Sequence, residues 1–228
     1  MRNSCILGMA AAILFAPAGD AFQTINIQTI NVSGDVIKGS GVLLEEARNV
    51  PEFSDIDLSG VFEVLVRCDQ KQEVIVSGDD NVVPHVKTEV NGSVLKVSLN
   101  QSVSTSNKIR LILATNRLNS LKVSGTTNVD ISRLRNKSFN LEIFGTGDIK
   151  AEGMSDDLEI TMSGTGNVDA KDLTAKTAGV DVSGAGNIVL SVSDELRASV
   201  SGVGNVYYYG NPGKVVRTVS GVGGIHKR

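Results

Sequence analysis

The stretch Ser163-Gly164-Thr165-Gly166-Asn167-Val168 decides the fold, because close copies of it recur through the second half of the chain. The other copies begin at Ser124, Phe144, Ser183, Ser201 and Ser220, at spacings of 18 to 20 residues. A fixed short period indicates a repeat architecture, in which each unit is one supersecondary element. We therefore expect a solenoid with repeats of about 19 residues.

Apolar residues alternate with polar ones on both sides of each corner. Ile160 and Met162 precede Ser163, whereas Val168 and Ala170 follow Asn167. This period of two is typical of short strands with one buried face. The glycines permit positive φ or close backbone approach, and Asn or Asp can bond to nearby backbone groups of the turn.

One such unit cannot bury its apolar face alone, whereas stacked units bury it continuously. The sequence therefore predicts an all-β fold, a right-handed parallel β-helix-like solenoid of short Gly-punctuated repeats. An up-and-down sandwich is the alternative, but it would not require the same Gly corner to recur in register.

Composition agrees with an all-β chain and sets limits on its partners. The 228 residues are 41% hydrophobic but only 4% aromatic, with 24 glycines and no Trp, so Val, Ile and Leu must build the core. The formal charge is -3, from 22 basic and 25 acidic residues spread along the chain. Since no Lys/Arg stripe stands out in the sequence, nucleic acid is not an expected partner.

Three segments are expected. Residues 1–21 resemble a signal peptide, with Arg2, an apolar run from Ile6 to Phe15 and a small residue at Ala21. That run is too short to span a bilayer, which takes roughly 20 residues, so we expect an exported protein, periplasmic or on the cell surface, without a transmembrane segment once the signal is removed. Residues 22–107 are an irregular β part, and residues 108–228 are the regular repeat.

Two local features belong to the irregular part and its surroundings. Asn91-Gly92 is a hairpin signal between two alternating runs. Signal removal leaves Cys68 as the only thiol, in a strand-like run, and we expect it to be a half-buried residue without a role.

The whole set of motifs resembles a bacterial family, the putative auto-transporter adhesin, head GIN domain. The matching pieces are Lys38-Gly39-Ser40-Gly41, Ile56-Asp57-Leu58-Ser59-Gly60, Asp79-Asp80-Asn81-Val82-Val83, Lys87-Thr88-Glu89-Val90, the Ser-Gly-x-Gly-Asn repeats and Tyr207-Tyr208-Tyr209-Gly210-Asn211-Pro212. The resemblance implies an exported β-helix-like domain with no assigned catalytic residues, for which adhesion is the conjectured role.

No catalytic, cofactor-binding or metal-ligating signature is evident. Strand parity directs His85 toward solvent, and His226 lies close to the end of the sequence, so neither is a suitable base for a serine nucleophile. Asp130 and Asp169 share a phase, but Lys150 lies between them. This alternation argues against a calcium ladder or an acid/base pair and favours ion pairs between coils.

The candidate ligand-binding residues are Tyr207 and Tyr209, which strand parity directs outward while Tyr208 points inward. Exposed aromatic rings bind sugars or proteins at low entropic cost, although these rings could instead cover the end of the core. We therefore expect a non-enzymatic, adhesin-like module that presents a solenoid face to an envelope glycan or protein. The alternatives are a structural periplasmic scaffold that self-associates and, third, a polysaccharide-active enzyme.

Overall fold

The computed structural model describes residues 36–228, which form an all-β solenoid of about five turns. The predicted fold class is therefore confirmed. The predicted signal peptide, residues 1–21, lies outside the described residues.

The first half of the described chain holds short strands and one 3-10 turn, Val83–His85. The strands are β1 (Ile37–Lys38), β2 (Leu43–Ala47), β3 (Asp55–Ser59), β4 (Val61–Cys68), β5 (Glu73–Asp79), β6 (Val86–Asn91), β7 (Val94–Leu99), β8 (Val103–Ser104), β9 (Arg110–Thr115) and β10 (Ser120–Val123). The second half holds β11 (Thr126–Ile143), β12 (Ile149–Met162), β13 (Thr165–Val182), β14 (Ala185–Val200), β15 (Val203–Tyr209), β16 (Lys214–Val219) and β17 (Val222–Lys227).

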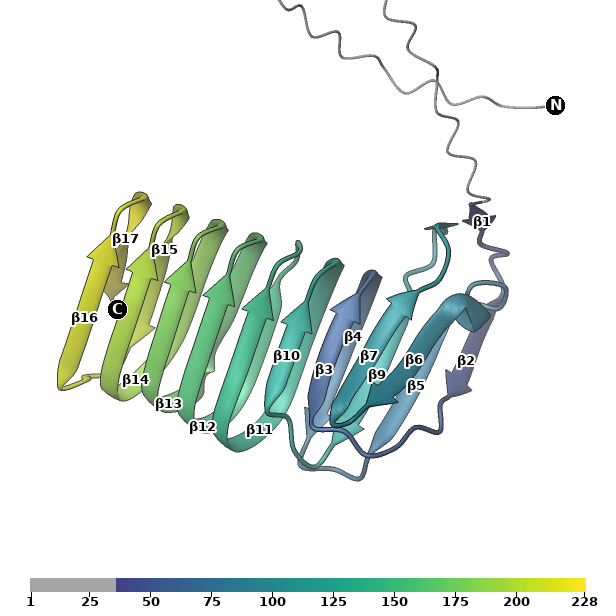
Figure 1. Cartoon of the computed structure of the whole chain (residues 1–228), viewed down its shortest axis with the longest axis horizontal. Helices are drawn as coiled ribbons and strands as arrows, with labels where there is room; N and C mark the ends of the chain where they lie inside the picture. The colour runs from purple at the N-terminus through teal and green to yellow at the C-terminus, as the bar shows by residue number, and fades with distance from the viewer. Residues whose placement is uncertain (1–35) are drawn as a thin grey trace, which may run out of the picture. The chain divides into compact units, whose positions relative to one another are not determined.

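Each of the long strands β11 to β14 runs down one side of the solenoid, bends at a lower corner and returns up the other side (Figure 1). The descending halves, with β4, β9, β15 and β17, make what we name the back sheet. The ascending halves, with β3, β7, β10 and β16, make the front sheet. Since the front strands run upward while the chain advances toward the left in Figure 1, the coil is right-handed.

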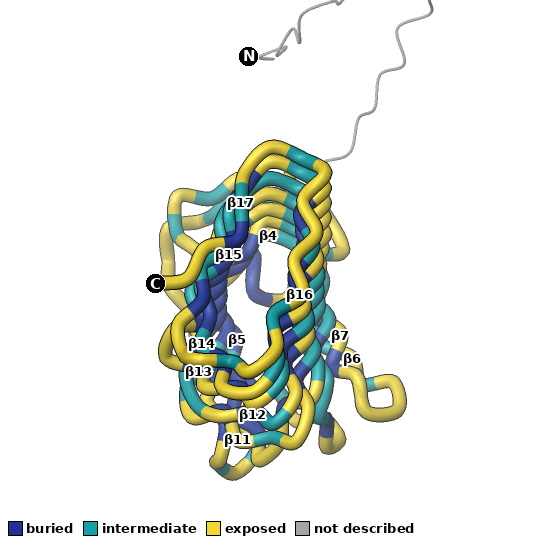
Figure 2. Tube along the Cα trace, turned by 90° about the vertical axis from the view of Figure 1, so that its left-hand side faces the viewer, coloured by how far each residue is buried: buried dark blue, intermediate teal, exposed yellow. Residues whose placement is uncertain are grey.

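Both sheets are parallel ladders in which equivalent repeat positions lie side by side. In the back sheet, Val129 pairs with Ile149, which pairs with Val168. In the front sheet, Leu141 pairs with Ile160, which pairs with Val180. These residues point inward, so a continuous aliphatic core fills the space between the sheets, as the dark blue segments of Figure 2 indicate. The alternation read from the sequence is thus confirmed.

The upper corners carry the Ser-Gly-x-Gly motif. A Cβ on Gly164 would lie 1.9 Å from the carbonyl oxygen of Gly145 on the preceding coil, so backbone packs directly on backbone there. Gly166 has φ +146°, a conformation that L side chains rarely adopt. Both roles expected of the glycines are therefore present.

Antiparallel strands cover the first-half end of the solenoid. β5 runs antiparallel to β2 and β9, and β6 runs antiparallel to β7. The β6–β7 hairpin confirms the signal at Asn91-Gly92. Its turn residues are Gly92 and Ser93, because Asn91 itself pairs with Val94 and Gly92 supplies the positive φ of 63°.

Residues 36–228 belong to one compact unit, and one sheet system runs from β2 to β17. The division into residues 22–107 and 108–228 stays a prediction based on regularity. Nowhere in residues 36–228 is there a helix with the length and apolar character needed to cross a membrane.

Candidate functional site

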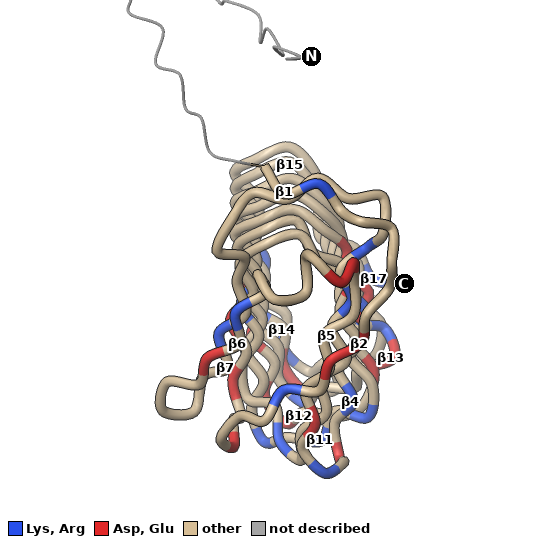
Figure 3. Tube along the Cα trace, turned by 90° about the vertical axis from the view of Figure 1, so that its right-hand side faces the viewer, with Lys and Arg blue, Asp and Glu red and all other residues tan. Residues whose placement is uncertain are grey.

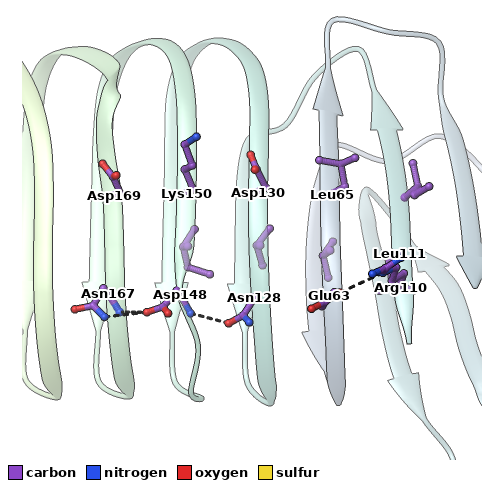
Figure 4. A pocket seen from close by; sticks show the side chains of 14 residues that line it. Glu63, Leu65, Arg110, Leu111, Asn128, Asp130, Asp148, Lys150, Asn167 and Asp169 are labelled. Atoms are coloured by element: carbon purple, nitrogen blue, oxygen red, sulfur yellow. Dashed lines mark hydrogen bonds and ion pairs between the residues drawn. The ribbon is translucent and has the colours of Figure 1, made fainter. Parts of the chain in front are cut away.

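A groove of about 680 Å³ crosses the outer surface of the back sheet, and we name it the outer groove (Figure 4). Strands β9, β4, β11, β12 and β13 form it, side by side. Its lining residues are Glu63, Val64, Leu65, Arg110, Leu111, Ile112, Asn128, Val129, Asp130, Asp148, Ile149, Lys150, Asn167 and Asp169. Because the outward side chains of parallel coils share a phase, the groove is organised in rows that run across the strands.

We name the two rows by their places in Figure 4, where the lower row is the one nearer the Ser-Gly-x-Gly corners. This lower row is a ladder of amide and carboxylate side chains. Asn128 Oδ1 accepts a hydrogen bond of 3.1 Å from the backbone N–H of Asp148. Asp148 Oδ1 accepts bonds of 3.0 and 2.9 Å from the backbone and side-chain nitrogens of Asn167. We expected these side chains to bond within their own turn, but they bond to the next coil, because stacking places equivalent positions of neighbouring coils side by side, about 4.8 Å apart.

The upper row contains Asp130, Lys150 and Asp169, which Figure 4 places in one line. Asp130 pairs in register with Lys150, which pairs with Asp169, so the shared phase is as expected. The ion pairs expected among these three residues are not formed. Asp169 instead lies 3.1 Å from Lys171 of its own strand. Lys150 is exposed and has no described carboxylate within ion-pair distance, so its charge is available to a ligand.

Apolar side chains continue the upper row toward β9. Leu65 of β4 pairs with Asp130 on one side and with Ile112 of β9 on the other. Leu65 and Ile112 are half-buried although they face outward. The groove therefore combines an apolar patch with charged and amide groups, the usual composition of a recognition site.

Glu63 closes the β9 side of the groove with two cations. Its carboxylate pairs with Lys108 and, at 3.2 Å, with Arg110. The hydrogen bond from Lys108 is the main cause that lowers the pKa of Glu63 below its ordinary value, and Arg110 acts in the same direction. Glu63 is consequently ionised at neutral pH.

Tyr207 and Tyr209, the candidate ligand-binding residues, lie outside the lining of the outer groove. Tyr207 occupies the upper row beyond Asp169, with Val189 between them. Its ring stacks on His226 with centroids 5.5 Å apart, and the Arg228 guanidinium lies 4.3 Å from its centroid. Tyr209 is 42% exposed, and its role in binding stays a prediction.

Tyr208 points inward, as strand parity indicated. It is only 2% exposed, and the Arg217 guanidinium donates a hydrogen bond to its hydroxyl and lies over its ring. This one tyrosine therefore covers the end of the core.

The other chemically notable residues have structural environments. His85 was expected to face solvent, but it ends the 3-10 turn, is half-buried and lies with Nδ1 3.0 Å from Asn100 Oδ1. The strand parity used for it does not apply in a 3-10 turn. Cys68 is fully buried rather than half-buried, and burial is the main cause that raises the pKa of its thiol to about 12. Residues 36–228 contain no group of three or more His, Cys, Asp and Glu placed to hold a metal ion.

Sequence reasoning missed the outer groove as a site. The available signal was the row of Asp130, Lys150 and Asp169, which it interpreted as an ion-pair ladder. Leu65 and Ile112 lie in the irregular first half. Their place beside that row depends on the pairing of β4 with β11 and with β9, which the repeat motif does not predict.

Comparison with known proteins gives one family and several solved structures. The model of the family described as putative auto-transporter adhesin, head GIN domain, matches residues 52–212. A putative adhesin from Bacteroides fragilis is 25% identical, with a TM-score of 0.71, over 84% of this chain and 100% of that one.

Two further structures support the fold alone. A putative adhesin from Parabacteroides merdae is 19% identical, with a TM-score of 0.56, over 86% of this chain and 100% of its own. One from Parabacteroides distasonis is 22% identical, with a TM-score of 0.54, over 85% and 100%. No curated protein matches the sequence.

Proposed function

We infer the function from one premise, that the chain belongs to the putative auto-transporter adhesin, head GIN domain family. We propose that it is an exported, non-enzymatic module. In this proposal the module binds an envelope or surface glycan or protein in its outer groove. The names of the family and of the structural neighbours support an adhesin-like role. The partner and the face that holds it are the new parts of the proposal.

The observation that carries the proposal is the state of Lys150. Its exposed ammonium group forms no ion pair with a described residue and is in register with two carboxylates. The outward-facing Leu65 lies in the same row, so the surface combines polar and apolar recognition. Since β-sheet hydrogen bonds fix every strand of this surface, little conformational entropy is lost when it binds.

Binding through the outer groove is tested with a double variant, Leu65→Gln with Lys150→Glu. The probe is capture of the fluorescently labelled protein on whole bacterial cells. We expect at least about a tenfold loss of capture, because a buried apolar contact and a charged contact are both removed. The matched control is Lys96→Gln on β7 of the front sheet, an exposed lysine for which no ion pair is formed with a described residue. Equal capture by the double variant and the control would refute the groove as the binding site.

The class of partner follows from treating the same cells. Periodate oxidation of the cells abolishes capture if a glycan is held, whereas protease treatment abolishes it if a protein is held.

For the enzyme alternative, the protein is incubated with a panel of acidic polysaccharides. Release of shortened or unsaturated sugars would overturn the non-enzymatic assignment.

Location is tested by protease digestion of intact cells, with an antibody against this protein and a periplasmic marker as control. Digestion in intact cells supports an adhesin on the surface. Protection until the outer envelope is opened would reject surface adhesion and favour binding or scaffolding in the periplasm.

A further inference from the structure

The lower bend of β11 carries a run of exposed cations. Its sequence is Ser132-Arg133-Leu134-Arg135-Asn136-Lys137-Ser138, in which Arg133, Arg135 and Lys137 are exposed while Leu134 is buried. The bend therefore exposes three positive charges within five residues.

Arg117 joins these residues from the segment between β9 and β10. It lines a groove of about 800 Å³ with Arg135, Lys137 and neighbours on three successive segments. The full lining is Arg117, Asn119, Arg135, Asn136, Lys137, Ser138, Met154, Ser155 and Asp156. Arg133 lies outside this lining, in a neighbouring pocket that it shares with Arg135 and Asp69. We name the four cations Arg117, Arg133, Arg135 and Lys137 the basic corner.

The charges of the basic corner are not neutralised by the part of the chain that the structure describes, where none of the four forms an ion pair. Asp156, the acidic residue of the groove, is already paired with Lys176 at 2.7 Å. Figure 3 shows blue segments, together with red ones, at the lower end of the solenoid. In a chain with a net charge of -3, the result is a local excess of positive charge that attracts anions.

The backbone adds a second, independent observation. Arg133 has φ +60°, one of only two residues other than glycine with positive φ in residues 36–228. That region favours Gly or Asn, and a longer side chain there is held at a cost in strain. An arginine at a position better suited to glycine indicates that its side chain serves a purpose beyond the turn.

We propose that the basic corner binds an anionic polysaccharide through its sulfate or carboxylate groups. The side chains between the cations are amides and hydroxyls, Asn119, Asn136 and Ser138, which suit sugar hydroxyl groups. The groove has no aromatic residue on which a nucleic-acid base could stack, and Met154 is its one exposed apolar side chain, too little for insertion into a bilayer. No residue is shared with the outer groove, so the two sites can be tested separately.

The test compares two charge-matched double variants of the full chain by calorimetric titration with size-defined heparin. Arg117→Gln with Arg135→Gln removes two cations of the basic corner, whereas Lys87→Gln with Lys96→Gln removes two exposed cations of the β6–β7 hairpin. We expect at least about a tenfold weaker binding for the first variant, because each lost charge-assisted contact accounts for about that much. The second variant should bind within about twofold of the wild type.

Further arms identify the anionic group and the kind of polymer. Polygalacturonate carries carboxylates only, so its binding reports whether sulfate is required. The proposal requires that heparin or polygalacturonate binds at the basic corner, and binding of neither would overturn it. Single-stranded DNA and phosphatidylglycerol vesicles are the competing ligands. Tighter binding to either competitor, or equal loss of heparin binding in the two double variants, would overturn the proposal. Unchanged heparin binding by Lys150→Glu would confirm that the outer groove is a different site.

Discussion

Glycine at the upper corners is required by the closeness of the coils. Gly164 illustrates this, since an added Cβ would lie 1.9 Å from Gly145 O and within 3.0 Å of two further backbone atoms of that residue. Those atoms belong to a hydrogen-bonded backbone that cannot move without separating the coils. Five other glycines at the same corner position repeat the role, namely Gly125, Gly145, Gly184, Gly202 and Gly221, but Gly164 lies nearer the middle of the stack.

Gly164→Ala is therefore expected to destabilise the protein by at least about 2 kcal/mol, since overpacking against a rigid backbone typically costs 1–3 kcal/mol. The measurement is the urea midpoint of unfolding. Gly213→Ala is the control, because its Cβ would meet only Asp194 O, at 3.9 Å. That variant should have an unchanged or slightly higher urea midpoint, because alanine lowers the conformational entropy of the unfolded chain. Equal midpoints for the two variants would contradict the close approach of the coils.

Asp79 joins three segments of the first half through one carboxylate. It is buried, and it accepts hydrogen bonds from the Thr105 hydroxyl, from Asn107 Nδ2 and, at 3.2 Å, from the backbone N–H of Gly41. The bond from Thr105 is the main cause that lowers the pKa of Asp79, followed by the bond from Asn107. The folded protein thus favours the ionised carboxylate.

A lowered pKa gives a definite pH dependence. The stabilisation by ionised Asp79 is fully present above the ordinary pKa of 3.8 and is lost as the pH falls through the lower pKa of the folded state. Asp79→Asn should be less stable than the wild type at pH 7, and the difference should shrink as the pH falls below about 4. Urea midpoints for both proteins from neutral to acidic pH provide the measurement. A difference that does not change with pH would show that the charge is unimportant.

Side-chain direction was predictable for residues in regular strands and not for those in irregular ones. Strand parity placed Tyr208 inward, because β15 keeps the alternation of the repeat. It failed for His85, where a 3-10 turn breaks the alternation. The environment of Asp79 could not be predicted either, because its partners lie 26 and 28 residues further along and no periodic signal links them.

At the scale of the element, the ladder of Asn side chains across the back sheet links successive strands. It continues from Asn167 to Asn187 and from Asn187 to Asn205, with side-chain bonds of 3.3 and 3.2 Å. Asp148 is the exception. Its carboxylate accepts from Asn167 but cannot donate to Asn128, so one side-chain bond of the ladder is not made.

Asp148→Asn should complete the ladder, because the new amide can donate to Asn128 Oδ1 while it still accepts from Asn167. We expect a stabilisation of about 0.5 kcal/mol, at the lower end of the range for a hydrogen bond because the site is exposed. Asn167→Ala removes bonds on both sides and should destabilise by about 1 kcal/mol. Thermal unfolding of both variants measures the two effects. Destabilisation by Asp148→Asn would contradict the ladder as the source of these bonds.

The elements of the second half were predictable because one motif sets both the corner and the register. No such guide exists for the parallel pairing of β4 with β9, which brings Leu65 beside Ile112 in the outer groove. The lower bends, which carry the basic corner, also lack a guide because their residues differ from coil to coil. Each candidate site thus involves a part of the chain where the repeat does not fix the structure.

At the scale of the whole molecule, a solenoid must limit pairing at its open strands. β16 and β17 form the outermost coil, with Val222 71% exposed and Val219 45% exposed. Two of its inward positions carry charges. Arg217 is in register with Ala198, and Lys227 is in register with Tyr208. Inward-pointing charges on an edge strand discourage another sheet from adding to it.

Arg217→Val with Lys227→Val should therefore turn the outermost coil into a surface that self-associates. The wild type is expected to keep one mass over a wide range of concentration in sedimentation velocity, whereas the variant should show a mass that rises with concentration. Neutral replacement by Gln at both positions is the control, because it removes the charge but keeps polar groups at the edge. A wild type that already associates would contradict the charged cap and would favour the self-associating scaffold over a monomeric adhesin, since the same exposed strands would then pair with a second copy.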